Sequence, residues 1–470
     1  VRDTTITAQN AFSELFFDST ALESYIAAHQ LNDTESRQFR DFYNARNYQY
    51  AWFFKDGLAE QAYNFLNQQT DYVQYSGDTS LTNPVLKQIL DTLESGGQVT
   101  FMSDSNRLNT ELLLTRQFFR YAENAYQGSS SLNASDLKWF IPRKKIDLVA
   151  TLDSLIAHKG DRSAAYEPLN IYYQRLKQSL LRYYEIEKAG GWQPVLTNKK
   201  KLQQGDTGKV IIAIKNRLRL TGDFDLTDSS GLFTDSLATA VKRFQHRYGV
   251  KEDGVIGPAM LKEINMPVEK RIRQMLINLE RMRWVPAKVE GDFLLVNIPE
   301  FKLHIFEDSK PVYAMNVVVG TNQNNTVIFY GDLKYIVFSP YWNVPPGILK
   351  NEVLPGMKKD KNYLAKHNME IAGYTTGGLP NVRQKPGSNN SLGKVKFLFP
   401  NNYNIYMHDT PAKSLFGESR RAFSHGCIRL GEPKKLAEFL LRNDSTWTSA
   451  AIDKAMNSGK EKYVTLRDAI

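Results

Sequence analysis

The chain has 470 residues, which is too long for one ordinary hydrophobic core and suggests roughly three domains of about 150 residues each. Hydrophobic residues make up 42% and charged residues 23% of the sequence, a composition that excludes disordered, collagen-like and coiled-coil proteins. The net charge of +10 favours an anionic partner, which leaves nucleic acid, an acidic membrane surface and a cell-wall polymer open.

Neither a membrane-spanning stretch nor a signal peptide is recognisable. No segment approaches the ~18 uninterrupted apolar residues of a spanning helix, and the first residues lack the basic-then-apolar layout of a signal. We therefore expect any export signal or membrane anchor to lie outside these residues. The single cysteine, Cys427, excludes an intramolecular disulfide framework and a cysteine-based zinc knuckle.

Residues 1–198 have helical periodicity and predict a helical scaffold domain without a catalytic constellation. Asn83 is typical of an N-cap with Pro84 in the first turn, and Pro168 is expected to open another helix. The apolar stripes of these two helices are predicted to be Val85, Ile89, Leu90 and Leu93 in the first, and Leu169, Tyr172, Leu176, Leu180 and Tyr183 in the second.

Residues 199–266 predict a small three-helix module. Leu237, Val241, Phe244 and Tyr248 keep helical spacing, and the run 253–258 marks a tight turn into a last short helix. The series resembles the peptidoglycan-binding module of many wall enzymes. Residues 267–288 then predict an amphipathic helix that starts at Pro267 and returns to the scaffold. Its arginines are expected to be solvated, namely Arg271, Arg273, Arg281 and Arg283.

Residues 289–470 switch to a period of two and predict a β-rich, β-sandwich-like domain. The alternation runs through 293–298 and 301–305, and residues 307–310 turn the chain into a strand over 313–319. Residues 341–400 interrupt this pattern with nine basic and three acidic residues, and their aromatic and aliphatic content indicates an ordered lid. The whole chain is thus expected to be an α+β multi-domain protein.

The candidate catalytic residues gather around the cysteine. His408-Asp409-Thr410 follows a strand-like segment, and Ser424-His425-Gly426-Cys427-Ile428-Arg429 comes after it. A thiol attacks as its thiolate, and a nearby imidazole can take its proton and lower its pKa. His408 is the better base because it can approach the sulfur from an adjacent strand, whereas the ring of His425 would run parallel to the thiol. The amides of Gly426 and Cys427 are candidates for an oxyanion hole.

This pattern resembles the signature of the L,D-transpeptidase (YkuD-type) catalytic domain, a bacterial cysteine transpeptidase of peptidoglycan. Further runs resemble the large periplasmic subgroup with a helical scaffold, a peptidoglycan-binding module and a lid, among them 383–387, 392–393, 396–401 and 406–411. The resemblance implies that Cys427 is the nucleophile, His408 the general base, and Asp409 the residue that orients His408 through its backbone carbonyl. It also implies a periplasmic or cell-envelope location and no cofactor.

The implied reaction is acyl transfer between peptidoglycan stem peptides. Cys427 would form a thioester with a tetrapeptide stem, release D-Ala and pass the acyl group to the amine of a second stem's diaminopimelate. Arg429 is a candidate for binding a stem carboxylate, with a buttressing role as the alternative. Tyr406, Ser424, His425, Trp342 and Arg383 complete the substrate-binding candidates, and for Ser424 a local hydrogen bond is the competing interpretation. Carbapenem-type β-lactams are the implied covalent inhibitors.

Several alternatives stay open at this point. Water or a lipoprotein as acceptor would make the protein an L,D-carboxypeptidase or a lipoprotein-attaching enzyme, and a non-catalytic wall-binding protein is a third alternative. His408, His425 and Cys427 are legitimate zinc ligands, but the ligand spacing of known zinc motifs is missing. Nucleic-acid binding is disfavoured because the sequence has no nucleic-acid-binding motif and much of the charge excess lies in the lid.

Overall fold

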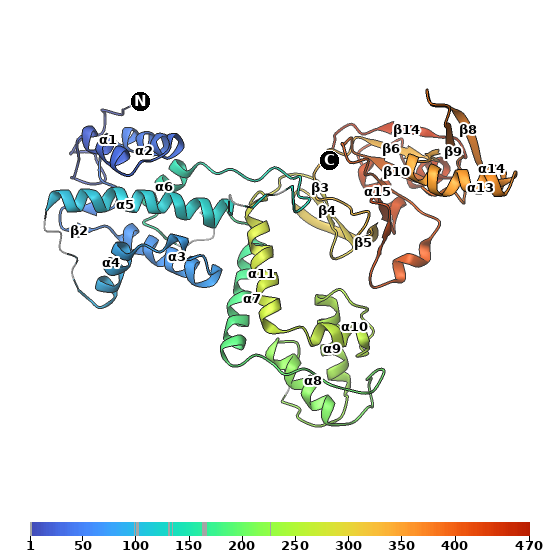
Figure 1. The fold of residues 1–470 in the computed structure, drawn as a ribbon, viewed down its shortest axis with the longest axis horizontal. Helices are drawn as coiled ribbons and strands as arrows, with labels where there is room; N and C mark the ends of the chain where they lie inside the picture. Colours follow the sequence, from blue (N-terminus) through green and yellow to red (C-terminus); the bar gives the residue numbers. More distant parts are fainter. Residues whose placement is uncertain are drawn as a thin grey trace. The chain divides into compact units, whose positions relative to one another are not determined.

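The computed structural model describes residues 2–470 except 98, 100–102, 130, 131, 134, 162–166 and 226. None of the predicted site residues falls in these gaps. The chain forms two compact units (Figure 1). The first comprises Val1–Asn133, Pro142–Gln193 and Met266–Lys288, and the second comprises Ala134–Ile141, Pro194–Asn265 and Val289–Ile470. The protein is an α+β multi-domain protein, and the domain boundaries proposed from the sequence stay predictions.

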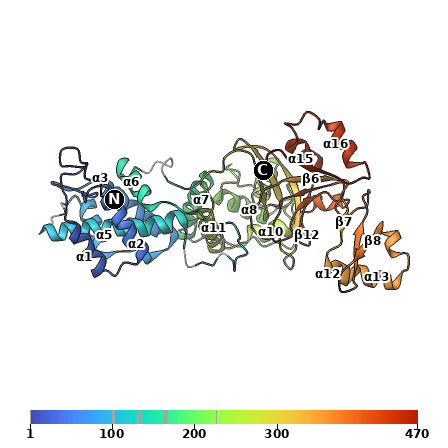
Figure 2. The same cartoon turned by 90° about the horizontal axis from the view of Figure 1, so that it is seen from above.

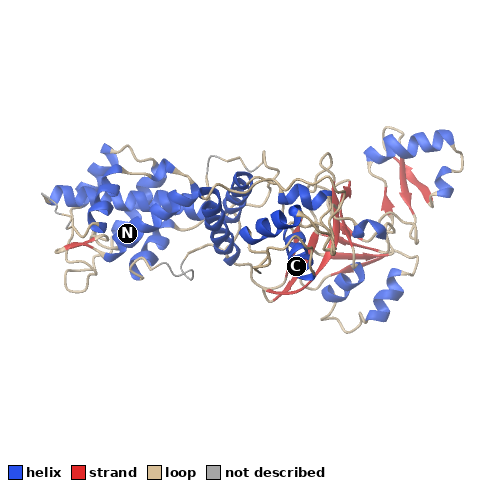
Figure 3. Cartoon of the chain, turned by 90° about the horizontal axis from the view of Figure 1, so that it is seen from below, coloured by secondary structure: helices blue, strands red, loops and turns tan. Residues whose placement is uncertain are grey.

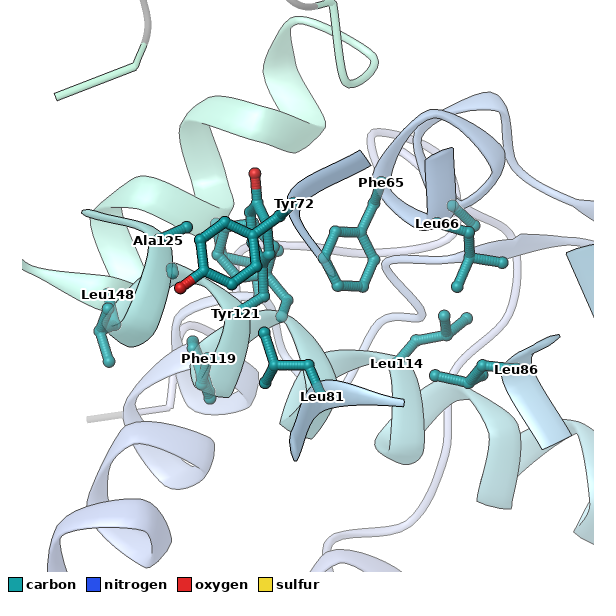
Figure 4. Close-up of a cluster of buried hydrophobic side chains, with 14 of the residues drawn as sticks. Phe65, Leu66, Tyr72, Leu81, Leu86, Leu114, Phe119, Tyr121, Ala125 and Leu148 are labelled. Atoms are coloured by element: carbon teal, nitrogen blue, oxygen red, sulfur yellow. The ribbon is translucent and has the colours of Figure 1, made fainter. Parts of the chain in front are cut away.

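The first unit is helical and has one large aromatic core. Its elements are α1 Ser19–Ala28, α2 Asp33–Ala45, β1 Phe53–Phe54, β2 Gly57–Leu58, α3 Glu60–Ser76, η1 Thr79–Leu81, α4 Pro84–Glu94, α5 Asp104–Ala122, η2 Glu123–Gln127, α6 Leu148–Ala157, α7 Ile171–Lys188 and α11 Val268–Arg283. Figure 4 shows part of this core, where Phe65 of α3 and Tyr121 of α5 pack together with ring centroids 5.5 Å apart. The many tyrosines and phenylalanines of this region therefore stabilise the scaffold through burial.

Two predicted helix starts have different outcomes. α4 begins as expected, because the Asn83 side chain accepts from the backbone N–H groups of Val85 and Leu86. Its buried stripe is shifted, however, since Val85 is 53% exposed and Leu86 is buried. α7 begins at Ile171 rather than at Pro168, because the Asn170 side chain caps the N–H of Tyr173. This later start buries Tyr173 and leaves Tyr172 exposed, contrary to the predicted stripe.

Helix α11 starts after Pro267 as predicted and packs beside α7 (Figure 1). The expectation that its arginines are solvated is wrong for Arg271 and Arg283, which are 5% and 4% exposed. Arg283 donates to Glu280 Oε2 at 2.6 Å and to the Tyr173 hydroxyl at 2.8 Å. A guanidinium can be buried where carboxylate and phenol oxygens replace water.

The small module of the second unit has its own core. Helices α8 Lys209–Leu220, α9 Asp235–Arg247 and α10 Pro258–Ile264 enclose a cluster of apolar side chains that includes Leu237, Val241 and Phe244. The Thr234 hydroxyl caps α9 by accepting from Leu237 N–H. Three helices with a shared core agree with the sequence-based expectation for this segment.

The C-terminal part of the second unit is built on a nine-stranded mixed sheet. Its neighbours run β14-β6-β10-β11-β13-β5-β4-β3, with β12 pairing to β5. These strands enclose one hydrophobic core, as expected for the β-rich domain. The strands are β3 Phe293–Asn297, β4 Lys302–Glu307, β5 Lys310–Gly320, β6 Tyr335–Phe338, β10 Val395–Leu398, β11 Met407–His408, β12 Ala422–Ser424, β13 Ile428–Leu430 and β14 Lys462–Thr465, and the helices packed with them are α15 Pro433–Leu440 and α16 Ser449–Met456.

The predicted lid forms a small separate sheet with short helices (Figures 2 and 3). Strands β7 Trp342–Asn343, β9 Pro380–Gln384 and β8 Met369–Tyr374 pair in that order, and the helical segments are α12 Pro346–Ile348, η3 Leu349–Val353, α13 Leu354–Lys359 and α14 Tyr363–Lys366. Leu349, Val353 and Val382 give it a core of its own. The boundary of 341–400 is too generous, because β10 belongs to the large sheet and its Val395 and Phe397 are fully buried there.

No helix in the described part of the chain has both the length and the apolar character that a membrane crossing requires.

Candidate active site

The predicted nucleophile and base lie on neighbouring strands. β11 and β13 run parallel, with Met407 paired to Ile428 and His408 paired to Arg429. Met407 and Ile428 point into the hydrophobic core. Because side chains alternate along a strand, Tyr406, His408, Cys427 and Arg429 project from the opposite face of the sheet. The fold therefore brings together four of the residues singled out from the sequence.

A tight turn presents Cys427 at the start of β13. The Ser424 hydroxyl donates to Cys427 O at 2.5 Å and accepts from Gly426 N–H at 3.2 Å. Ser424 is 2% exposed, so its hydroxyl holds the turn, in agreement with the local-bond interpretation. Gly426 has a φ of 113°, a conformation that favours glycine. Since the Gly426 N–H is already bonded to Ser424, the expected oxyanion contact from this amide is not available in the structure.

The surroundings of the sulfur are polar but mostly enclosed. Cys427 Sγ donates to the Asn404 carbonyl oxygen at 3.6 Å, and both the backbone N–H and the hydroxyl of Tyr406 face it. Burial raises the pKa of the Cys427 thiol, and the opposing effects of Tyr406 and the Arg429 charge are smaller. The same proximity raises the pKa of Tyr406, after the larger effect of burial. The lowering of the thiol pKa that a nearby imidazole can cause is therefore outweighed by burial in this state.

His408 is buried and held in one orientation. Its Nδ1 lies 2.5 Å from the Asp409 carbonyl oxygen, which can only accept, so this contact favours the neutral tautomer with the proton on Nδ1, and the ring also faces the backbone of Leu392. Burial lowers the pKa of His408 to about 4, assisted by the Arg429 charge and opposed by the Asp409 carbonyl. The ring is thus neutral at pH 7. Its centroid lies 5.7 Å from that of Tyr406. No direct His408–Cys427 hydrogen bond is formed in this structure, although both residues are described.

The Asp409 side chain has a different task from its carbonyl. One carboxylate oxygen accepts from Lys394 N–H at 2.9 Å, and the other pairs with Lys413 Nζ at 2.6 Å. Gly393 lies so close that an added Cβ would be 2.4 Å from the carboxylate carbon. The carboxylate therefore ties β11 to the turn before β10, and this anchors the backbone whose carbonyl contacts His408.

Residues 291–448 match the family model described as "L,D-transpeptidase catalytic domain". Residues 37–180 match a "Scaffold domain", and residues 207–264 match a "Putative peptidoglycan binding domain". The chain carries an L,D-transpeptidase catalytic domain. The YkuD-type resemblance inferred from the sequence, with its scaffold and wall-binding module, is thereby confirmed.

One curated relative and several solved structures are also similar. A Haemophilus influenzae protein named "Putative L,D-transpeptidase" is 34% identical over 215 residues, and the match covers 42% of this chain and 43% of that protein. The chain therefore spans less than half the length of the relative it matches. An L,D-transpeptidase structure from Xylanimonas cellulosilytica is 15% identical, covers 53% of this chain and 94% of its own, and has a TM-score of 0.18. An L,D-transpeptidase structure from Stackebrandtia nassauensis is 15% identical, covers 52% of this chain and 91% of its own, and has a TM-score of 0.23. We base no conclusion on scores this low.

Within the L,D-transpeptidase domain, Arg429 is a cation that acts on both of the predicted catalytic residues. It is partly exposed, its charge acts on both His408 and Cys427, and its Nε is buried without a hydrogen-bond partner among the described residues. Burial lowers the pKa of its guanidinium. An arginine with an unused donor is suited to a carboxylate ligand.

The other predicted substrate residues lie outside the paired strands β11 and β13. His425 is exposed on the nucleophile turn. Trp342 and Arg383 lie in the small lid sheet, in strands that do not join the large sheet. Arg383 is paired with Glu370 at 2.7 Å and lies over the Tyr341 ring. Within the described residues no group of three or more His, Cys, Asp and Glu side chains is arranged to hold a metal ion, so the zinc alternative finds no ligand set there.

Two residues of this site were missed from the sequence. The Asn404 carbonyl oxygen accepts from the sulfur, and Asn404 has a φ of 54°. The sequence carried only a weak signal for this residue, namely an Asn among other turn-forming residues. Thr326 donates through its hydroxyl to Gly426 O at 2.7 Å across a separation of 100 residues. Such a contact depends on the tertiary fold, and no local sequence pattern predicts it.

Proposed function

We propose that the chain is a peptidoglycan L,D-transpeptidase in which Cys427 is the nucleophile and His408 the general base. The observation that carries this proposal is the pairing of β11 with β13, which places the only cysteine on the same face as a neutral, oriented imidazole. The match of residues 291–448 to the catalytic-domain family supports it.

The first half-reaction is attack on a tetrapeptide stem. Nε2 of His408 takes the thiol proton as Sγ attacks the carbonyl carbon of the residue before the terminal D-Ala. A raised thiol pKa and a neutral imidazole mean that proton transfer accompanies attack, instead of preceding it in a resting ion pair. Catalytic hydrogen bonds often shorten only when substrate is bound, which accounts for the open His408–Cys427 arrangement. The C–N bond then breaks, the imidazolium gives its proton to the departing D-Ala amine, and a thioester remains.

The second half-reaction transfers the acyl group. The side-chain amine of diaminopimelate on a second stem attacks the thioester carbonyl, and His408 accepts the proton that the amine loses. The C–S bond breaks, the thiol is restored, and the product is a crosslink between two diaminopimelate residues.

Two groups near the sulfur suit the charges of this reaction. The Cys427 N–H remains as an oxyanion donor, because the Gly426 N–H is bonded to Ser424. Arg429 has a buried Nε without a partner among the described residues, and a stem carboxylate would supply one. The module of residues 207–264 and the basic lid are consistent with a cell-envelope protein that works on an anionic wall polymer. Carbapenem-type β-lactams would acylate the same sulfur.

Product analysis tests this proposal and separates its alternatives. Purified protein is incubated with tetrapeptide-containing muropeptides and the products are identified by mass. Crosslinked dimers with loss of D-Ala are expected, tripeptides alone would indicate carboxypeptidase activity, and added lipoprotein acceptor tests the attachment alternative. Cys427→Ala should form neither product while it still binds sacculi, and Cys427→Ser is the size-matched control. Dimer formation by Cys427→Ala would overturn the nucleophile assignment.

A further inference from the structure

A short segment that lies between two scaffold helices in the sequence packs against the catalytic domain. Residues 135–141 come between η2 and α6 of the first unit, yet they belong to the second unit. The segment forms a parallel bridge at Trp139 and Ile328. Phe140 N–H donates to Ile328 O at 2.6 Å, and Ile328 N–H donates to Lys138 O at 3.1 Å. We call residues 135–141 the brace.

The brace contacts the loop that supplies the carbonyl facing the sulfur. Phe140 packs on Tyr403 with ring centroids 4.9 Å apart, and the ring centroid of Phe329 lies 5.0 Å from that of Tyr403. Tyr403 directly precedes Asn404, whose carbonyl accepts from Cys427 Sγ at 3.6 Å. Since packing against two other rings limits the motion of Tyr403 and of the backbone that carries it, Phe140 restrains the position of the Asn404 carbonyl.

A second set of contacts leads from the brace to the residue before the nucleophile. With its side-chain nitrogen facing the Thr321 carbonyl, Asn325 accepts from Lys138 Nζ at 3.1 Å. The next residue, Thr326, donates to Gly426 O at 2.7 Å and accepts from Gly320 N–H at 2.9 Å. Lys138 therefore helps to fix the 321–328 loop, and this loop fixes the peptide that joins Gly426 to Cys427.

We propose that Lys138 and Phe140 are positioning residues that set the orientation and environment of the Cys427 thiol through these two loops. Neither side chain has a described contact with Sγ, so both act through Asn404 and Thr326. One path ends at the Asn404 carbonyl, which accepts from Sγ, and the other at the Gly426 carbonyl, in the residue before the nucleophile. Their catalytic consequence rests on the proposed function, whereas their effect on the thiol itself does not.

Alkylation of the thiol measures this effect without any substrate. The rate of Cys427 modification by iodoacetamide is recorded against pH for the full chain and for Phe140→Ala, Phe140→Tyr, Lys138→Ala and Lys138→Arg. Leu137→Ala is the matched control, because Leu137 lies on the same segment and is 40% exposed. We expect the midpoint of the alkylation profile to move in Phe140→Ala and Lys138→Ala, and to stay in place in the two conservative variants and the control.

Steady-state kinetics on a tetrapeptide donor give the second readout. Misplacement of a reacting group by a fraction of an ångström lowers kcat more than it raises KM, and we expect about a tenfold lower kcat in Phe140→Ala. If the alkylation midpoint matches wild type in both alanine variants, or moves as far in Leu137→Ala, the proposal is wrong. Absence of product with the wild-type protein would instead contradict the proposed function and leave the alkylation comparison intact. Thermal unfolding identifies a variant that fails to fold, and Lys138→Ala then carries the test, since its side chain is exposed.

Discussion

Buried ionisable groups in the scaffold and in the catalytic domain differ in how completely their hydrogen-bonding capacity is used. Glu111 of α5 is fully buried, and its carboxylate accepts from Ala51 N–H at 2.7 Å, Trp52 N–H at 2.9 Å and the Tyr43 hydroxyl at 3.0 Å. His408 is buried as well, and its ring faces the backbone of Asp409 and Leu392, whereas the buried Nε of Arg429 has no hydrogen-bond partner among the described residues.

This difference distinguishes a structural polar cluster from a reactive one. In the scaffold each bond to Glu111 joins segments that are distant in sequence, so the carboxylate organises the fold around residues 51–52. In the catalytic domain the unpartnered donor belongs to Arg429, which lies on the same face of the sheet as Cys427. Unfilled hydrogen-bonding capacity in a buried site costs stability, and it becomes useful when a substrate fills it.

Removal of the imidazole should have the largest effect. His408→Gln keeps a side chain of similar reach but cannot accept the thiol proton, so kcat should fall by roughly 10²–10⁴-fold with little change in the melting temperature. In the wild type, activity should fall as pH drops through about 4, because protonated His408 is no longer a base. Initial rates across pH and a melting curve check both statements. If the His408→Gln enzyme stays active, His408 is not the base, and the polar cluster of the catalytic domain would be structural like that of the scaffold.

Glu111→Ala tests the scaffold side of the comparison. It leaves two buried backbone N–H groups without their acceptor and removes one of the two partners of the Tyr43 hydroxyl, which keeps Thr115 at 2.6 Å, so we expect a loss of about 3 kcal/mol in the free energy of unfolding of the first unit. Amide hydrogen exchange of peptides from α5 measures this loss. Thiol alkylation of Cys427 should not change in the same variant. A large change in alkylation with intact exchange protection would contradict the structural role.

Arg429→Ala should come next in size. If the partly exposed guanidinium of Arg429 binds a stem carboxylate, its loss removes a charge-assisted hydrogen bond and raises KM by roughly 10–100-fold. Arg429→Lys should recover only part of this, because an ammonium lacks the guanidinium fork. Arg442→Ala is a control from the same domain, since the Arg442 Nε already donates to Glu307 at 2.8 Å. An unchanged KM in Arg429→Ala would favour the buttressing role.

The sequence predicted the site better than it predicted the packing around it. The site residues Cys427, His408 and Arg429 lie in or next to short strands. Side chains alternate along a strand, so the local sequence pattern is enough to place these residues on one face. Arg283 is buried because the Tyr173 hydroxyl accepts from it, a contact between distant residues that the sequence pattern does not reveal. α7 starts late because Asn170 caps it, and helix propensity alone does not distinguish between neighbouring start positions. The raised thiol pKa was missed because burial of the sulfur outweighs its polar neighbours, and burial is a tertiary property.

The smallest effect concerns the pH dependence of scaffold stability. Burial raises the pKa of Glu111 from 4.5 to about 7, so between these values the folded state holds a proton that the unfolded chain has released. This contribution to stability is complete below the unfolded pKa and is lost as pH rises through the folded one. Glu111→Gln cannot titrate, and its free energy of opening should lack this slope.

From about pH 5.5 to about pH 6.5 the wild type should lose up to about 1.4 kcal/mol relative to Glu111→Gln, since one proton separates its folded and unfolded states there. Hydrogen exchange of α5 at the two pH values, corrected for intrinsic exchange rates, gives the difference. Parallel slopes would mean that the three donors keep Glu111 ionised in the folded state. In that case the scaffold cluster would be a fully satisfied carboxylate at every pH in this range, and its contrast with the partly partnered His408 would be sharper still.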